Sequence, residues 1–224
     1  GDQNTSSGNT ILNLVAHAAA IKAYDPSLIF YLIALGDDNV IAVKGVKDPE
    51  AFMAFVSAYL KNLGFRPKLR KRTIDNVSFC SGFFAPVNGE DGPTRVLVPA
   101  LERSLSKFGF SHQDLHTPGR TYLGSTVKSQ PLMALVPILR VLYSFYSKDG
   151  RATTPRNPHR RRSDGTVEAS AATAAWFREM TGISDAAMEK LEGKLQAHLE
   201  KTDGAASFFS DEDLVSVLLN SRPW

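Results

Sequence analysis

Two apolar runs separated by four polar residues constrain the fold of this 224-residue chain more than any other feature. Leu28–Leu35 and Val40–Val43 consist of β-branched, aromatic and other apolar side chains. Gly36-Asp37-Asp38-Asn39 stands between them, and these residue types tolerate the positive φ angles of tight hairpin turns. The sequence therefore predicts a β-hairpin with acidic residues at its tip.

Helix signals flank this hairpin. Asn9–Ala23 repeats apolar residues at helical spacing, and Asp48–Leu63 combines an N-cap aspartate, a proline at the first position and Gly64 as a stop. Val77–Phe84 is expected to form a strand or a tight hairpin, and residues 86–93 are rich in turn formers. Further helices are expected at Val98–Phe108, Gln130–Tyr146, Thr166–Met180, Ser184–Lys201 and Asp211–Leu219.

This order of elements predicts an α+β fold in two parts. Residues 1–87 are expected to hold the hairpin and its packed helices, and residues 88–224 a mainly α-helical region. A loop rich in proline, glycine and arginine is expected at 148–165.

Composition excludes several classes of protein. With 43% hydrophobic and 22% charged residues, the chain has the balance of a globular domain. Its single cysteine, Cys80, excludes an internal disulfide, and no Cys/His cluster has zinc-site spacing. The longest apolar run is too short to cross a membrane. A net charge of +3 permits a polyanionic partner without requiring one.

The acidic tip suggests metal chemistry. Adjacent carboxylates repel each other, and a divalent cation relieves that repulsion. Mg²⁺ commonly takes one or two carboxylates together with substrate phosphates. Because neighbouring side chains on a strand point to opposite faces, we expect Asp37 rather than Asp38 to be the principal ligand. The alternative interpretation is a solvated turn that binds nothing.

The segment at the start of the chain carries a second polar pattern. Thr5 and Asn9 are four residues apart, which places them on one face of a helix that has already begun. A hydroxyl and an amide together can hydrogen-bond a sugar hydroxyl. The same residue types also serve in any loop that leads into a helix.

Together these segments resemble the palm of RNA-dependent RNA polymerases of positive-strand RNA viruses. Gly1–Thr10 is similar to motif B in its tombusvirus-like and nodavirus-like form, and Gly36–Asp38 to motif C. The segment ending at Leu63–Lys68 resembles motif D, and Val77–Ser81 resembles motif E, the primer grip. The motifs follow one another in the family's usual order.

The resemblance implies template-directed nucleotidyl transfer that depends on Mg²⁺, with Mn²⁺ as a possible substitute. It gives catalytic and metal-binding roles to Asp37 and Asp38 and a general-acid role to Lys68, although the nearby basic residues leave the last choice open. The nucleotide-binding residues would be Gly1, Asp2, Thr5 and Asn9, of which Thr5 and Asn9 would sense the ribose 2′-hydroxyl. The primer-binding residues would be Phe79, Cys80 and Ser81.

A basic tract in the predicted loop is a further candidate for RNA contact. Arg160, Arg161 and Arg162 can neutralise phosphates, in which case binding depends strongly on salt. The alternative is a solvated loop. Residues 143–146, which include three aromatic side chains, are a weaker candidate for contact with RNA.

The resemblance also implies what lies around this chain. The partners would be an RNA template and product strand and ribonucleoside triphosphates, at membrane-associated replication sites in the host cytoplasm. Motif A and the fingers would lie before Gly1, and the chain starts without methionine. We therefore expect a palm fragment followed by a helical thumb, or one half of a divided polymerase, inactive by itself.

Two other functions remain open from the sequence. A non-catalytic RNA-binding or replicase-accessory protein would use the arginines, and its acidic tip would be only a turn. A reverse transcriptase would be expected to carry an aromatic residue two places before the aspartate pair, where this chain has Leu35-Gly36.

Overall fold

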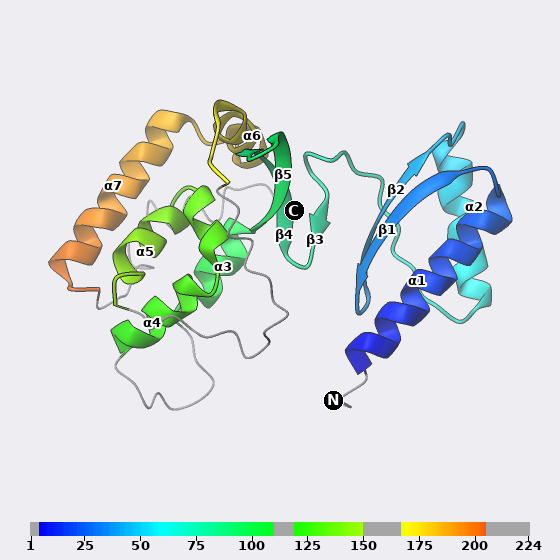
Figure 1. Ribbon diagram of the computed structural model, residues 1–224, viewed down its shortest axis with the longest axis horizontal. Coiled ribbons are helices and arrows are strands. Elements are labelled where there is room, and N and C mark those ends of the chain that lie inside the picture. The colour runs from blue at the N-terminus through cyan, green and yellow to red at the C-terminus, as the bar shows by residue number, and fades with distance from the viewer. Residues whose placement is uncertain (1–4, 110–118, 150–166, 205–224) are drawn as a thin grey trace. The chain divides into compact units, whose positions relative to one another are not determined.

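The computed structural model describes residues 5–109, 119–149 and 167–204, and the chain divides into two compact units, Gly1–Cys80 and Ser81–Trp224 (Figure 1). The predicted α+β class is confirmed. The predicted domain boundary at residue 87 lies inside a strand of the second unit. The assignment of the two parts to palm and thumb stays a prediction.

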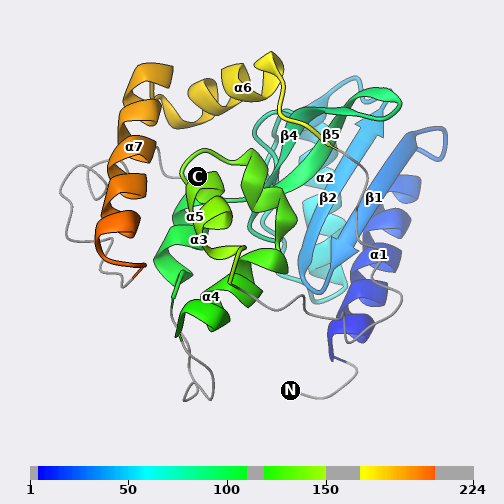
Figure 2. The same ribbon diagram turned by 60° about the vertical axis from the view of Figure 1, so that its left-hand side comes forward.

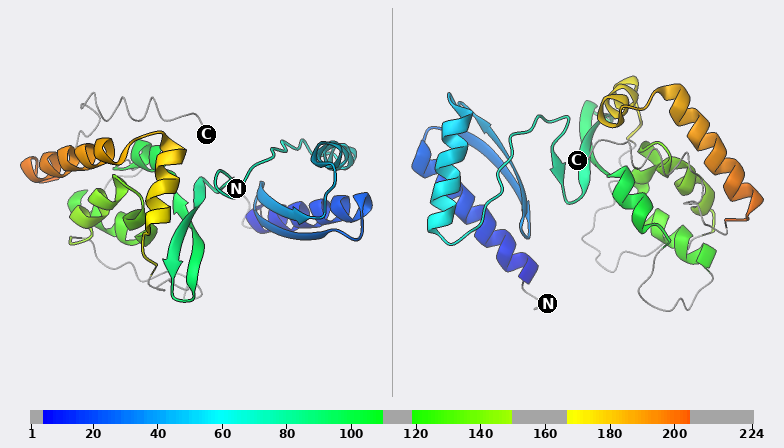
Figure 3. Two further views of the ribbon diagram at one scale, coloured as in Figure 1. Left: turned by 90° about the horizontal axis from the view of Figure 1, so that it is seen from above. Right: turned by 180° about the vertical axis from the view of Figure 1, so that it is seen from behind.

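The first unit is built on the predicted hairpin and its two helices. α1 (Thr5–Tyr24) precedes β1 (Ile29–Leu35) and β2 (Asp38–Lys44), and α2 (Pro49–Asn62) follows. β1 and β2 are antiparallel with Leu35 opposite Asp38, so Gly36 and Asp37 form a two-residue turn. α1 packs against β1 on one side and against α2 on the other (Figure 3).

Local signals explain why α2 begins and ends where it does. The Asp48 carboxylate accepts hydrogen bonds from the backbone N–H groups of Glu50 and Ala51, at 3.0 Å each. Two of the free N–H groups of the first turn are thus satisfied. At the other end Gly64 has a φ of 87°, which a residue without Cβ adopts at little cost. Both ends agree with the sequence prediction.

One face of the hairpin is covered by helix and the other is exposed. The alternate residues Phe30, Leu32 and Ala34 of β1 are half-buried. The small core between α1 and α2 consists of Ala16, Ala20, Val56 and Leu60. The opposite face of β1 presents large apolar side chains to solvent, namely Ile29, Tyr31, Ile33 and Leu35, with Tyr31 75% exposed.

The second unit joins a hairpin to a cluster of helices. β4 (Gly82–Gly89) pairs antiparallel with β5 (Gly92–Pro99), and α6 (Ala171–Thr181) packs against β4 (Figure 2). The remaining elements are β3 (Ser78–Phe79) at the end of the first unit, and in the second unit α3 (Leu101–Lys107), α4 (Gly119–Lys128), the 3₁₀ helix η1 (Pro131–Leu135), α5 (Leu139–Tyr146) and α7 (Asp185–Lys201).

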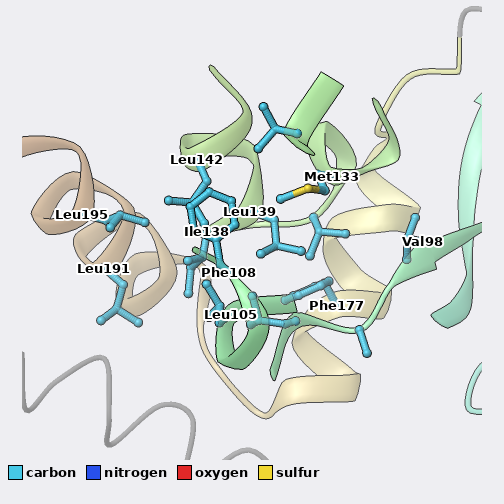
Figure 4. Packing of buried hydrophobic residues seen from close by; sticks show 14 of the residues in the cluster. Val98, Leu105, Phe108, Met133, Ile138, Leu139, Leu142, Phe177, Leu191 and Leu195 are labelled. Atoms are coloured by element: carbon cyan, nitrogen blue, oxygen red, sulfur yellow. The ribbon is translucent and has the colours of Figure 1, made fainter. Parts of the chain in front are cut away.

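One apolar core holds the second unit together. Figure 4 shows Val98 of β5, Phe177 of α6 and Leu105 of α3 pointing into the same cluster, together with Leu139 of α5 and Leu195 of α7. The strand and the helices therefore share a single core. Because elements that are distant in sequence contribute side chains to this core, they fold together as one unit.

Two predicted segments of the second unit differ in the structure. Residues 86–93, predicted to be turn-rich, belong mostly to β4 and β5, and the turn is confined to Glu90 and Asp91. The single helix predicted over Gln130–Tyr146 is divided into η1 and α5. Pro137 disfavours the helical conformation in the residue before it, and Ile138 has a φ of 66°.

The other helix predictions have mixed outcomes. Ser184–Lys201 is confirmed as α7 with Ser184 as its N-cap. α3 starts at Leu101 because β5 continues to Pro99, and α6 starts after Ser170 rather than at Thr166. α4 was not predicted, because its Gly, Ser and Thr residues are weak helix formers. The helix predicted at Asp211–Leu219 lies outside the described residues.

Candidate active site

The hairpin tip presents two carboxylates to solvent. Asp37 lies in the turn and Asp38 is the first residue of β2, and both side chains are exposed. Gly36 has a φ of 63°, which matches turns that place glycine at the first central position. Because Asp37 belongs to the turn, strand alternation does not set its direction, and the argument that favoured it over Asp38 on that ground was wrong.

Side chains of α1 hold the backbone of this turn. Thr10 Oγ1 accepts a hydrogen bond from the Gly36 N–H at 2.8 Å. Asn13 Nδ2 donates to the carbonyl oxygens of Gly36 and Asp37, at 3.1 and 3.2 Å. The sequence analysis missed both residues. Their three-residue spacing indicates that they share a helix face, but no local sequence signal predicts that this face contacts the turn.

The pair predicted to bind ribose lies on the first turns of α1. Thr5 and Asn9 are both helical and both exposed, so the predicted helical spacing is confirmed. Their side chains are therefore accessible to a ligand. Gly1 and Asp2 lie outside the described residues.

Cys80, the middle residue of the predicted primer grip, lies close to the acidic turn in the first unit, whereas Ser81 is the first residue of the second unit. Cys80 is exposed in a turn, and Cys80 and Ser81 have φ angles of 49° and 63°. The pKa of the Cys80 thiol is raised, mainly because neighbouring atoms displace some of its water and to a smaller extent because Asp38 and Asp37 are negatively charged. β3, which contains the half-buried Phe79, contacts β2. The structure thus brings Cys80 near the two aspartates, which are distant in sequence.

Lys68 lies in a basic stretch after α2. Residues 65–73 have no regular secondary structure, and Leu69 packs against the small core between α1 and α2. Arg66, Lys68 and Arg70 alternate with the more buried Pro67 and Leu69, so the basic side chains face solvent. In the described part of the chain, no ion pair joins Lys68 to either aspartate of the turn.

The chemistry of the turn fits part of a Mg²⁺ site. Its donors are carboxylate oxygens, which are the hard ligands that Mg²⁺ prefers. Among the described residues, no group of three or more His, Cys, Asp or Glu side chains could hold a metal ion. The turn therefore fits a cation that keeps water and phosphate ligands, rather than one fully enclosed by protein.

Comparison with known protein families assigns this chain to one of them. The model of a family described as viral RNA-dependent RNA polymerase matches residues 1–202. The chain belongs to this family. The match covers the acidic turn, the helix that holds it and most of the second unit, and it favours a polymerase over the non-catalytic RNA-binding alternative. A search of curated proteins found no match.

Family membership makes this chain a viral RNA-directed RNA polymerase at the level of the family, which implies RNA and nucleotides as substrates. Within the described ranges of the polymerase, no helix has both the length and the apolar character needed to span a membrane. The basic tract Arg160–Arg162 lies outside those ranges.

One predicted RNA contact in the polymerase was wrong. Tyr146 is fully buried, and its hydroxyl donates to the Gly204 carbonyl at 2.8 Å. Burial raises the pKa of Tyr146 to about 12. A side chain without exposed surface has no face on which a base can stack, so Tyr146 belongs to the core.

Proposed function

We propose that Asp37 and Asp38 are the catalytic, Mg²⁺-binding carboxylates of template-directed RNA synthesis, with Mn²⁺ able to replace Mg²⁺. One observation carries the proposal. Two adjacent exposed carboxylates stand on a hydrogen-bonded turn, at the end of an apolar hairpin, in a chain of the viral polymerase family. Adjacent negative charges favour a site that a divalent cation occupies.

The other predicted residues receive roles around this turn. When bound, Mg²⁺ lowers the pKa of the attacking 3′-hydroxyl and neutralises charge on the triphosphate. Thr5 and Asn9 hydrogen-bond the ribose 2′-hydroxyl from the exposed start of α1. Lys68 protonates the departing pyrophosphate. Gly1 and Asp2 extend the nucleotide-binding segment.

RNA contacts complete the proposal. Phe79, Cys80 and Ser81 contact the primer or product strand beside the acidic turn, which the proximity of Cys80 to the aspartates supports. Arg160, Arg161 and Arg162 neutralise RNA phosphates.

The remaining metal ligands come from the triphosphate, from water and from an aspartate of motif A elsewhere in the polymerase. The polymerase is of the tombusvirus-like or nodavirus-like kind and acts at membrane-associated sites in the host cytoplasm.

The first test replaces a carboxylate without changing its shape. Asp37→Asn in the full-length polymerase should reduce nucleotide incorporation by about 10²-fold or more, because a neutral amide is a poor ligand for Mg²⁺. Incorporation is measured by primer extension over a Mg²⁺ titration. Asp91→Asn is the matched control, because Asp91 is also an exposed aspartate at a hairpin turn.

Asp37→Asn and Asp91→Asn each remove one negative charge, but only Asp37→Asn removes a proposed metal ligand. Asp91→Asn should leave extension within about twofold of the parent, since surface substitutions away from a site change little. Normal extension by Asp37→Asn, or equal losses in the two variants, would contradict the catalytic role of the acidic turn.

A further inference from the structure

The two carboxylates depend on the turn backbone for their positions. Among the described residues, no side chain donates a hydrogen bond to either the Asp37 or the Asp38 carboxylate. Both are exposed, so packing does not fix them either. The direction of each carboxylate therefore follows from the conformation of Gly36, Asp37 and the first residues of β2.

The polar face of α1 satisfies most of the turn's backbone groups. The Gly36 N–H, the Gly36 carbonyl and the Asp37 carbonyl all bind Thr10 or Asn13. Thr10 Oγ1 also donates to the Ser6 carbonyl at 2.7 Å, which orients the hydroxyl so that a lone pair faces the Gly36 N–H. The helix thus supplies both a donor and an acceptor at fixed positions.

A second layer orients Asn13. Asn39 Nδ2 donates to Asn13 Oδ1 at 2.8 Å, which leaves Asn13 Nδ2 to face the turn. His17 Nδ1 lies 2.9 Å from the Asn13 carbonyl oxygen. A carbonyl only accepts, so Nδ1 carries the proton and Nε2 faces Asn39 as an acceptor at 3.5 Å. Asn13 and His17 are both buried, so these polar groups are protected from competing water.

We propose that Thr10 and Asn13 are positioning residues, which hold the turn so that the Asp37 and Asp38 carboxylates stand ready for the metal and the triphosphate. This inference rests on the proposed function of the two aspartates. A displacement of about 1 Å in a reacting group costs about 10²-fold in rate, so backbone control of this turn matters for catalysis. Asn39 and His17 support Asn13.

The test compares side chains that differ only in the hydroxyl. Thr10→Val keeps the shape of threonine and removes the acceptor for Gly36, whereas Thr10→Ser keeps the hydroxyl. Thr126→Val is the matched control, because Thr126 is also a half-buried helical threonine whose hydroxyl donates to a carbonyl four residues earlier, that of Tyr122. Thr126 belongs to α4 of the second unit, whereas the turn and α1 belong to the first.

The first readout does not depend on activity. Amide hydrogen exchange at Gly36, measured by NMR on the 224-residue chain, should be about fivefold faster or more in Thr10→Val, because its hydrogen-bond acceptor is lost. The Kd for Mn²⁺, measured by electron paramagnetic resonance, should rise by about the same factor. Thr10→Ser and Thr126→Val should match the parent in both measurements.

The second readout separates positioning from binding. In the full-length polymerase, Thr10→Val should lower kcat by about tenfold or more while the KM for nucleotide stays near that of the parent. Thr10→Ser should restore kcat. Should Thr10→Val fail to fold, the pair Thr10→Ala and Thr10→Ser gives the same comparison, since these two differ only by the hydroxyl.

The outcomes distinguish this inference from the proposed function. Unchanged Gly36 exchange in a folded Thr10→Val or Thr10→Ala chain would overturn the positioning role, as would faster exchange with unchanged Mn²⁺ affinity and kcat. If Asp37→Asn leaves Mn²⁺ affinity and incorporation unchanged, the proposed function itself fails. The metal-positioning role then fails with it, even where Gly36 exchange depends on Thr10.

Discussion

Single residues in the first unit show how function can depend on exposed side chains with buried support. Thr5, Asn9, Asp37 and Asp38 are all exposed, whereas Asn13 beneath the turn is buried. Exposed side chains are accessible to a ligand. The buried polar side chain is costly to leave unsatisfied and therefore holds a definite geometry.

Sugar selection can be tested at this scale. Thr5→Ala or Asn9→Ala should weaken the preference of the full-length polymerase for ribonucleotides over deoxyribonucleotides by about fivefold, because each removes one hydrogen bond worth about 1 kcal/mol. The ratio of kcat/KM for the two nucleotide types measures this preference. Ser7→Ala, an exposed change on the same helix, is the control. Unchanged selectivity in both variants would make the pair structural.

At the scale of elements, the break between η1 and α5 depends on a contact with α7. Ile138 is fully buried with a φ of 66°, an unfavourable conformation for a β-branched residue. Its N–H donates to the Glu192 carboxylate at 2.8 Å. The same carboxylate binds Arg140, whose pKa it raises. A buried charge is thus paired, and the strained backbone is held in place.

Removal of this carboxylate should destabilise the second unit. Glu192→Ala should lower the free energy of unfolding by about 1–3 kcal/mol, because the buried Ile138 N–H loses its acceptor. Urea denaturation measures the change. Glu192→Gln keeps a carbonyl oxygen and should lose less. Glu189→Ala, an exposed substitution on the same helix, should cost less than about 0.5 kcal/mol, and equal losses at the two positions would contradict this role.

The described residues of the chain supply two carboxylate ligands at the turn. They contain no cluster of three ligating side chains. Mg²⁺ requires six oxygen ligands in near-ideal octahedral geometry and gives up water reluctantly. We therefore expect tight Mg²⁺ binding at the turn to require phosphate oxygens and further ligands besides Asp37 and Asp38.

The isolated chain should consequently make no RNA. Purified by itself with template, nucleotides and Mg²⁺, it should give no product above background in a primer-extension assay. Addition of a motif A and fingers portion, fused or as a separate chain, should restore synthesis. The positive control is a complete viral polymerase under the same conditions. Synthesis by the isolated chain that Asp37→Asn abolishes would show that its own residues complete the site.

Local physics made the first unit predictable from sequence. Apolar runs around Gly36–Asn39 predict the hairpin, and the Asp48 cap with Gly64 predicts both ends of α2, because these signals act between near neighbours in the chain. The α+β class followed from the order of elements along the whole chain, and the polymerase family from the motifs of residues 1–81. The acidic tip was predictable because glycine, aspartate and asparagine favour a turn, and because adjacent carboxylates favour a divalent cation.

Tertiary structure alone decided the support of that tip and the course of the second unit. The Thr10 hydroxyl reaches Gly36 across 26 residues of sequence, and Glu192 reaches Ile138 across 54. Most of residues 86–93 form strands, despite the prolines at 86 and 93, because β4 and β5 pair with each other and α6 packs against β4. Contacts between residues distant in sequence outweigh local conformational preferences, which amount to a few tenths to about 1 kcal/mol per residue. Such contacts cannot be predicted from a local sequence pattern.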